Sequence, residues 1–170
     1  MHGFQIWLNL PAREKMTPAS YQDIPAQELA NYTIGGSEIV AISGAATING
    51  ESVKGQLSDR KTNPIILDLR HSDTPGNWDI KIPDEYVVLL YVYKGNIALG
   101  EKLQPVKPKQ LARLSKSGEI RISAEAGTHV LLLAGNPLKE PIVQRGPFVM
   151  NTQEEIDQAE DDYKNGRLVS

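Results

Sequence analysis

Several residue types and patterns that mark particular protein classes are missing from this 170-residue chain. It has no cysteine, which excludes disulfide bonds, thiolate metal ligands and a cysteine nucleophile. No apolar run approaches the roughly 20 residues that span a bilayer, and the first residues lack the basic start of a signal peptide. The formal net charge of −3 offers no basic surface to nucleic acid or anionic lipid. We therefore expect a cytoplasmic protein with no nucleic-acid or membrane partner.

Histidine is also scarce, and its positions do not suggest a metal centre. The three histidines are His2, His71 and His129, so no His-x-His pair can place two ligands on one face of a strand. His71 precedes the polar stretch 72–76, which predicts a surface loop, and His129 opens an apolar strand, where a hydrogen-bonded structural role is expected. The chain also lacks a nucleophile elbow, a phosphate loop and a dinucleotide-binding pattern. The sequence therefore predicts no catalytic, cofactor-binding or metal-ligating residue.

The N-terminal segment, residues 1–37, is predicted to be a strand followed by an extended arm. "FQIWLNL" (4–10) alternates apolar and polar residues as a strand does. Residues 11–37 contain three prolines and a Gly-Gly pair, which predict a linker with at most one helical turn, near Ala26–Ala30. So long a linker is uncommon inside a compact domain, so we expect the first strand to pack on a different unit and to need a partner.

Residues 38–150 are predicted to form an antiparallel β-barrel. Short strand candidates recur between turn signals such as Asn49-Gly50, and glycines 95, 100 and 118 suit tight turns. The candidates are "EIVAISGAATI", "PIILDLR", "WDIKI", "YVVLLYVY", "NIALG", "QLARL", "EIRIS", "HVLLLAG" and "PIVQ". "YVVLLYVY" and "HVLLLAG" are almost continuously apolar, which is typical of central strands.

The barrel interior is expected to be a filled core, because small barrels are usually packed solid. Binding of a small apolar ligand inside it is the alternative. The residues expected to line this interior are Tyr86, Leu90, Val92, Leu131 and Leu133.

The C-terminal segment, residues 151–170, is predicted to form a short helix and a tail. A Gly146-Pro147 corner precedes it, and Phe148, Val149 and Met150 are expected to point inward. The helix is placed at 152–164, with Thr152 and Glu155 as a capping box and Gly166 just beyond its end. Its apolar face would carry Ile156, Ala159 and Tyr163, and its acidic residues are expected to form a solvated face.

Two stretches together resemble the pirin family of the cupin superfamily. They are "HGFQIWLNLP" with "KMTPASYQDI" near the start and "AGNPLKEPIVQRGPFVMNTQEEIDQA" at 134–159. The resemblance covers essentially the whole chain but only the second part of a pirin, which has two stacked cupin barrels. It implies an all-β fold of the cupin type, a double-stranded β-helix or jelly-roll-like barrel, with an N-terminal strand and a C-terminal helix.

In that family the metal is held in the first barrel, by histidines and a glutamate upstream of the part that resembles this chain. No metal residue is carried over, and the place of a His-x-His segment in the present barrel reads Lys81-Ile82-Pro83-Asp84-Glu85. Some bacterial pirins have quercetin dioxygenase activity, which requires the metal barrel. Other pirins act as protein partners, in transcription or metabolic regulation.

The hypothesis from the sequence is a metal-free, non-catalytic module that acts by protein binding or assembly, without a cofactor. Pairing or exchange of strand 4–10 would give a homodimer. The alternative is a cupin dioxygenase of the quercetinase type, with ligands that are not evident in this chain or that a missing N-terminal half supplies. A dimer interface that places His2 or His129 near an Asp or Glu would be one such source. A third possibility is that the chain is a fragment or a naturally short protein, and a separate N-terminal half could then assemble with it into a complete pirin.

Overall fold

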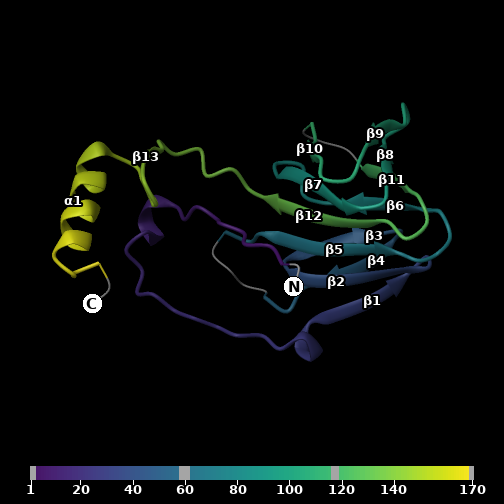
Figure 1. The fold of residues 1–170 in the computed structure, drawn as a ribbon, viewed down its shortest axis with the longest axis horizontal. Coiled ribbons are helices and arrows are strands. Elements are labelled where there is room, and N and C mark those ends of the chain that lie inside the picture. The colour runs from purple at the N-terminus through teal and green to yellow at the C-terminus, as the bar shows by residue number, and fades with distance from the viewer. Residues whose placement is uncertain (1–2, 58–61, 116–118, 169–170) are drawn as a thin grey trace. The chain divides into compact units, whose positions relative to one another are not determined.

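The computed structural model describes residues 3–57, 62–115 and 119–168, and this part of the chain is mainly antiparallel β-structure (Figure 1). It divides into two compact units, one formed by Met1–Asp23 with Leu138–Ser170 and one formed by Ile24–Pro137. We call them the terminal unit and the barrel unit. The N-terminal segment predicted at 1–37 is thus divided: its residues up to Asp23 belong with the C-terminal segment, and those from Ile24 belong to the barrel unit.

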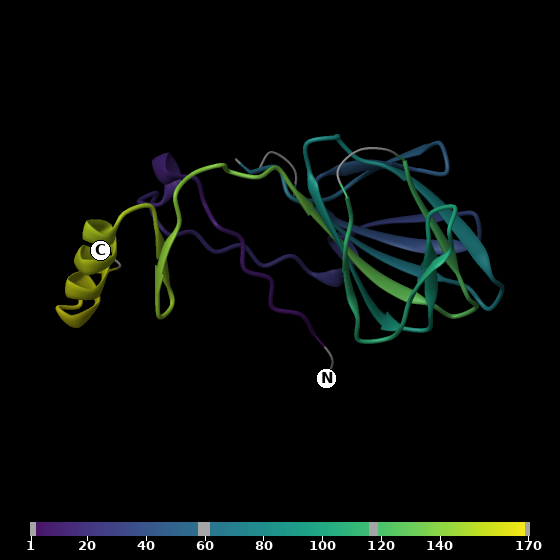
Figure 2. The same cartoon turned by 90° about the horizontal axis from the view of Figure 1, so that it is seen from above.

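The barrel unit consists of two six-stranded sheets, and the strands enclose a common interior (Figure 2). The first sheet has the order β1-β2-β5-β12-β7-β10 and the second has the order β4-β3-β6-β11-β8-β9. The strands are β1 Ala30–Ile34, β2 Ser37–Ser43, β3 Ala45–Ile48, β4 Glu51–Lys54, β5 Ile65–His71, β6 Gly76–Lys81, β7 Val87–Lys94, β8 Ile97–Leu99, β9 Gln104–Val106, β10 Leu111–Arg113, β11 Ile120–Ala124 and β12 His129–Gly135, preceded by a short 3-10 helix η2 at Ala26–Glu28. The prediction of an all-β cupin fold is confirmed.

The two most apolar strands, β7 and β12, are neighbours in the middle of the first sheet, as their composition predicted.

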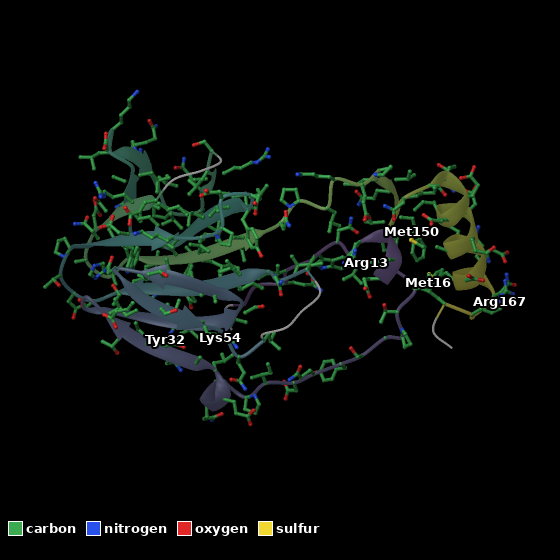
Figure 3. The ribbon with its side chains drawn as sticks, turned by 180° about the vertical axis from the view of Figure 1, so that it is seen from behind. Arg13, Met16, Tyr32, Lys54, Met150 and Arg167 are labelled. Atoms are coloured by element: carbon green, nitrogen blue, oxygen red, sulfur yellow. The ribbon has the colours of Figure 1, made fainter. Side chains whose placement is uncertain are left out.

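The predicted helical turn is η2, but β1 begins at Ala30 inside the segment expected to be linker. β1 pairs with β2 in the register Ile34↔Ser37, joined by the Gly35-Gly36 turn. The Tyr32 hydroxyl donates to the backbone oxygen of Lys54 at 3.0 Å and accepts from its N–H at 3.1 Å (Figure 3). This pair of hydrogen bonds ties β1 to β4, the edge strand of the other sheet.

The stretch "EIVAISGAATI", which reads as one strand, is two strands that lie in different sheets. Gly44 separates β2 from β3 and has φ +73°, a conformation that side chains rarely adopt. A Cβ on Gly44 would lie 2.6 Å from the backbone oxygen of Pro64, so the position also requires glycine for space. The glycine therefore marks the corner where the chain passes from one sheet to the other.

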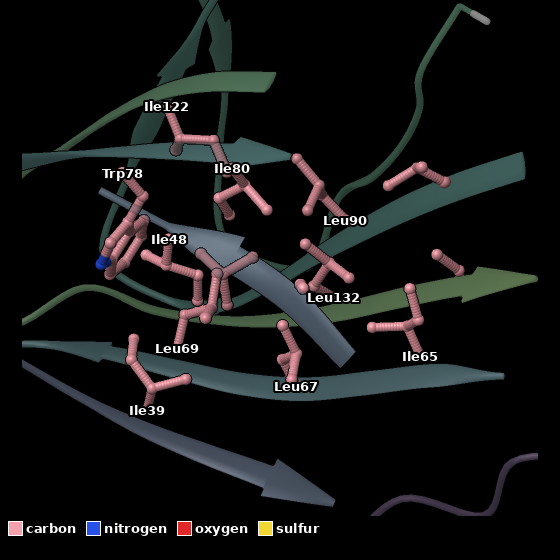
Figure 4. Packing of buried hydrophobic residues seen from close by; sticks show 14 of the residues in the cluster. Ile39, Ile48, Ile65, Leu67, Leu69, Trp78, Ile80, Leu90, Ile122 and Leu132 are labelled. Atoms are coloured by element: carbon pink, nitrogen blue, oxygen red, sulfur yellow. The ribbon is translucent and has the colours of Figure 1, made fainter. Parts of the chain in front are cut away.

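The core lies between the sheets and is made of alternate side chains from both (Figure 4). Ile39, Leu67, Leu69, Leu90 and Leu132 come from the first sheet; Ile48, Val53, Trp78, Ile80 and Ile122 come from the second, and all ten are fully buried. The Trp78 Nε1 donates to Ser37 Oγ at 2.9 Å, so the largest core side chain buries no unpaired donor. The expected filled interior is therefore present at the level of these residues.

The side chains of β12 that face the core are not the ones predicted. Leu90 and Val92 of β7 point into the core as expected, and Tyr86 packs on it partly buried. In β12 the core residues are Val130, Leu132 and Ala134, so Leu131 and Leu133 lie on the outer face of the sheet. A continuous apolar run carries no alternation that could reveal its inner face. The pairing with β5 sets it, because Val130 and Leu132 lie opposite the core residues Leu69 and Leu67.

The terminal unit contains a 3-10 helix η1 at Ala12–Glu14, the hairpin β13 Val143–Arg145 and β14 Phe148–Met150, and the helix α1 Gln153–Lys164. Residues 4–10, predicted as a strand, belong to no sheet in the described chain. The Gly146-Pro147 corner is the two-residue turn of the hairpin, with φ +57° at Gly146. Phe148, Val149 and Met150 are only partly buried, so the inward packing expected of them is incomplete. Met16 and Met150 are labelled in this unit in Figure 3.

The ends of α1 follow the prediction closely. Thr152 Oγ1 accepts from Glu155 N at 3.2 Å, and Glu155 Oε2 accepts from Thr152 N at 3.0 Å, which completes the capping box. Gly166 N donates to Tyr163 O and Arg167 N donates to Asp162 O, the two bonds of a Schellman motif. Ile156 and Ala159 are buried, but Tyr163 is 67% exposed and meets Phe148 only at the ring edge.

Two of the predicted turn glycines allow a matched test of the barrel. Gly95 and Gly100 have φ +71° and +64°, whereas Gly118 lies outside the described residues. A Cβ on Gly95 would lie 2.3 Å from Thr128 Oγ1 and 2.8 Å from its Cα, whereas nothing lies within 4 Å of one on Gly100.

We predict that Gly100→Ala lowers the free energy of unfolding by about 1–2 kcal/mol, through the left-handed backbone alone. Gly95→Ala carries the same backbone cost and adds a clash of about 1–3 kcal/mol. Urea denaturation of the two variants measures the difference. Equal losses would show that the contact between Gly95 and Thr128 is not tight in solution.

Candidate functional site

Polar and ionisable side chains gather at two places on the barrel unit. One is the end of the barrel where β2 begins and β5 finishes, which we call the histidine end. The other is the opposite end, where β6 finishes and β7 begins, which we call the mouth. His2 lies outside the described residues.

His71 is buried, and the expectation that it lies in a surface loop is wrong. It is the last residue of β5, is 5% exposed, and faces the interior after Ile65, Leu67 and Leu69. Its ring lies 5.3 Å from the ring of Trp78. The polar sequence that follows suggested a loop, but the period of two in "IILDLRH" extends through His71 and would have placed it correctly.

The imidazole of His71 lacks the hydrogen bonds that a buried polar ring normally has. Within the described residues, neither Nδ1 nor Nε2 has a hydrogen-bond partner. Gly76 closes over the ring, since a Cβ there would lie 2.0 Å from Nε2. Burial without a compensating acceptor lowers the pKa of His71, because the charged form would be poorly solvated.

His129 lies on the outer side of the same end. It is the first residue of β12, and its ring meets the edge of Tyr93 at 5.3 Å. Burial and the nearby Lys94 ammonium lower the pKa of His129. Both histidines line an open hollow of about 400 Å³, together with Glu38 and Arg70. No local pattern relates His71 to His129, because it is the pairing of β5 with β12 that brings both to the same hollow.

A small charged network lies beside this hollow on the outer face of the first sheet. Asp68 Oδ2 accepts from Arg70 Nε at 2.9 Å and from Arg70 Nη2 at 2.7 Å. Asp68 Oδ1 accepts from the Tyr93 hydroxyl at 2.6 Å. Burial and this hydrogen bond raise the pKa of Tyr93 to about 12, so the phenol stays protonated at neutral pH. The network therefore holds its protons and serves structure rather than proton transfer.

The mouth contains residues 81–85, the position at which a metal-binding cupin barrel would have a His-x-His segment. Ile82, Pro83 and Asp84 line a cavity of about 220 Å³ at this end, with Tyr86 across from them. The Tyr86 hydroxyl donates to the backbone oxygen of Asn63 at 3.2 Å, which leaves its ring as an apolar wall.

At neither end do the described residues provide the ligands that a cupin metal requires. Among the described residues, no three His, Cys, Asp or Glu side chains converge closely enough to hold a metal ion. In the hollow, His71 has its ring nitrogens buried, and Glu38 is directed to Arg70 at 3.5 Å. The residues present do not fit a cupin metal, and we derive no reaction step through one. In the same described part of the chain, no helix is long and apolar enough to cross a bilayer.

The buried histidine makes stability depend on pH. The folded-state pKa of His71 is lowered from an unfolded value of about 6.5. The unfolded chain therefore takes up a proton first as the pH falls, so stability is complete above about pH 6.5 and decreases below it.

For each such histidine the free energy of unfolding changes by at most about 1.4 kcal/mol per pH unit. We expect His71→Leu to flatten the unfolding free energy between pH 7 and 5.5, and to cost little at pH 7 because no hydrogen bond is lost. The matched variant His129→Gln reports the share of the outer histidine. A profile that His71→Leu leaves unchanged would contradict the buried, unprotonated ring.

Comparison with known proteins places this fold and these sites in a family. Residues 67–169 match the model of the pirin C-terminal cupin domain. A Pseudomonas aeruginosa protein provisionally named quercetin 2,3-dioxygenase is 44% identical over 171 residues, covering 99% of this chain and 60% of that protein. Pirin of Mus musculus is 34% identical over 170 residues, covering 98% of this chain and 57% of its own length.

A solved structure gives the same result for the fold. The crystal structure titled quercetin 2,3-dioxygenase from Acinetobacter baumannii superposes with a TM-score of 0.81 at 31% identity, over 96% of this chain and 56% of that one. The present chain thus spans about 60% of the length of the relatives it matches. The strands, the two-sheet barrel and the matching family model lead to one conclusion: the chain belongs to the pirin family, and its barrel is a pirin C-terminal cupin domain.

Proposed function

We propose that this pirin-family domain acts by binding and assembly, and that residues 4–10 pair with a second copy of the chain. The observation that supports the proposal is the distribution of exposed apolar side chains. In the described residues, every large exposed apolar side chain except Leu103 and Leu111 belongs to the terminal unit. That unit buries little in return, since Ile156 and Ala159 are its buried α1 residues.

The base of the arm is held by hydrogen bonds within the chain. Lys15 Nζ donates to Asn9 Oδ1 at 2.7 Å and to the backbone oxygen of Val149 at 2.9 Å. Ala12 N donates to Glu140 Oε2 at 2.7 Å, and Pro11 is buried. These contacts fix where the arm leaves the C-terminal hairpin.

Beyond that anchor, the arm exposes apolar groups on both of its sides. Ile6 and Leu8 are 37% and 52% exposed on one side, and Trp7 is 72% exposed on the other. Covering a fully exposed side chain of this size contributes about 1.5–3 kcal/mol. A strand from a second copy would cover these groups and pair the backbone of 4–10, and two identical surfaces related by a twofold axis would close the assembly.

Light scattering coupled to size-exclusion chromatography tests the proposal on the full chain. We expect a dimer at micromolar concentration, and conversion to monomer by Leu8→Asp, which would bury a carboxylate in the new contact. Leu103→Asp is the matched control, because Leu103 is 58% exposed but belongs to the barrel unit. A monomeric wild-type protein, or equal effects of the two substitutions, would refute exchange of the arm.

The second candidate function is metal-dependent dioxygenation of a flavonol. It is supported by the names of the relatives, since proteins of Pseudomonas aeruginosa and Vibrio cholerae at 44% and 36% identity are provisionally named quercetin 2,3-dioxygenase. Among the described residues no three metal-binding side chains converge, so this function would need ligands that are not evident there, supplied by an N-terminal half or by a second chain.

Metal analysis of protein purified without a histidine tag separates the two candidates. Binding alone predicts far less than one equivalent of iron, nickel, copper or zinc, and no consumption of quercetin after iron is added. A stoichiometric metal together with quercetin turnover would instead establish the enzyme.

A further inference from the structure

The mouth of the barrel offers a second, smaller binding site that is independent of assembly through the arm. The cavity of about 220 Å³ lies above the filled core and is walled by apolar side chains from four segments. Ile82 comes from the turn after β6, Leu99 from β8, Leu114 from the segment after β10 and Ile120 from β11. All four pack against the core and are only partly buried, so a ligand in the cavity would remove further apolar surface from water.

The size of the cavity limits the ligand to about one ring. Sites for drug-sized molecules usually measure about 300–1,000 Å³, and the present cavity is smaller than that range. The core limits its depth, because Val88, which lines the cavity, is buried and belongs to the core cluster. The ring of Tyr86 supplies a flat wall of the cavity. Its hydroxyl donates to the backbone oxygen of Asn63, so this polar group is already bonded.

The charges around the mouth favour a cationic group on that ring. Among the described residues, the cations beside the cavity are already paired, Lys81 with Glu119 at 3.5 Å and Arg121 with Asp79 at 2.9 Å. Asp84 lines the cavity, and within the described residues it has no hydrogen bond or ion pair. In this described part of the rim, the charge left unpaired is therefore negative.

We propose that the mouth binds a small molecule that consists of one aromatic or aliphatic ring with an amino group. The ring enters between Ile82, Leu99 and Tyr86, and the ammonium group pairs with Asp84. One ring and one ion pair predict a dissociation constant on the order of 1 mM.

Titration of the full-length, isotope-labelled protein by NMR tests this with three probes of the same shape. Benzylamine, benzyl alcohol and benzoate differ in charge, so we expect them to bind in that order of decreasing affinity. Saturable shifts should appear at the methyl groups of Ile82, Leu99 and Ile120. Benzylamine should bind about 3–10-fold more tightly than benzyl alcohol, as expected for a partly exposed ion pair.

Two substitutions separate the charge from the cavity. Asp84→Asn should bring benzylamine to the affinity of benzyl alcohol, while the affinity for benzyl alcohol itself stays unchanged. Asp73→Asn is the matched control, because β6 separates Asp73 from the mouth by about 20 Å, and it should leave all three affinities as they are. Absence of saturable shifts at the mouth, tighter binding of benzoate, or equal effects of the two substitutions would overturn the proposal.

Discussion

The fold depends on the burial of one face of every core strand between the two six-stranded sheets. Trp78 is the largest side chain in that layer, and its single polar atom is bonded to Ser37 of the opposite sheet. Because this layer is complete within residues 24–137, the barrel unit has a full apolar core of its own. The core limits the space for ligands at both ends of the barrel. It leaves a cavity of about 220 Å³ at the mouth, and at the other end His71 is buried.

The terminal unit has few buried apolar residues and many polar contacts. Its order comes from polar contacts, namely the capping box of α1, the two hydrogen bonds of Lys15, and the ion pair of Arg145 with Asp157 at 2.8 Å. An exposed ion pair such as that of Arg145 with Asp157 contributes little to stability. The unit has few buried apolar groups of its own and exposes Ile6, Trp7 and Leu8, which is the observation behind the proposed pairing with a second copy.

Short sequence motifs predicted correctly those features that depend on only a few neighbouring residues, such as helix ends and turns. The cap at Thr152, the glycine at the end of α1 and the turns at Gly95 and Gly100 follow from backbone chemistry within a few residues. The central position of β7 and β12 followed from their apolar composition.

The predictions that failed depend on contacts between distant segments. The division of "EIVAISGAATI" at Gly44 requires knowledge of Pro64, which the corner approaches. The inner face of β12 depends on its pairing with Leu67 and Leu69 of β5, and the ring of His71 is covered by Trp78 and Gly76. The cavity at the mouth is closed by four segments and has no local signature.

The central claim is that residues 4–10 form a β-strand by pairing with another copy of the chain. Hydrogen–deuterium exchange of the seven backbone amides of this stretch, measured over a range of protein concentrations, tests it most directly. The account predicts slow exchange that becomes slower as the concentration rises, because pairing between copies protects the N–H groups. Fast exchange of these amides at every concentration would contradict it.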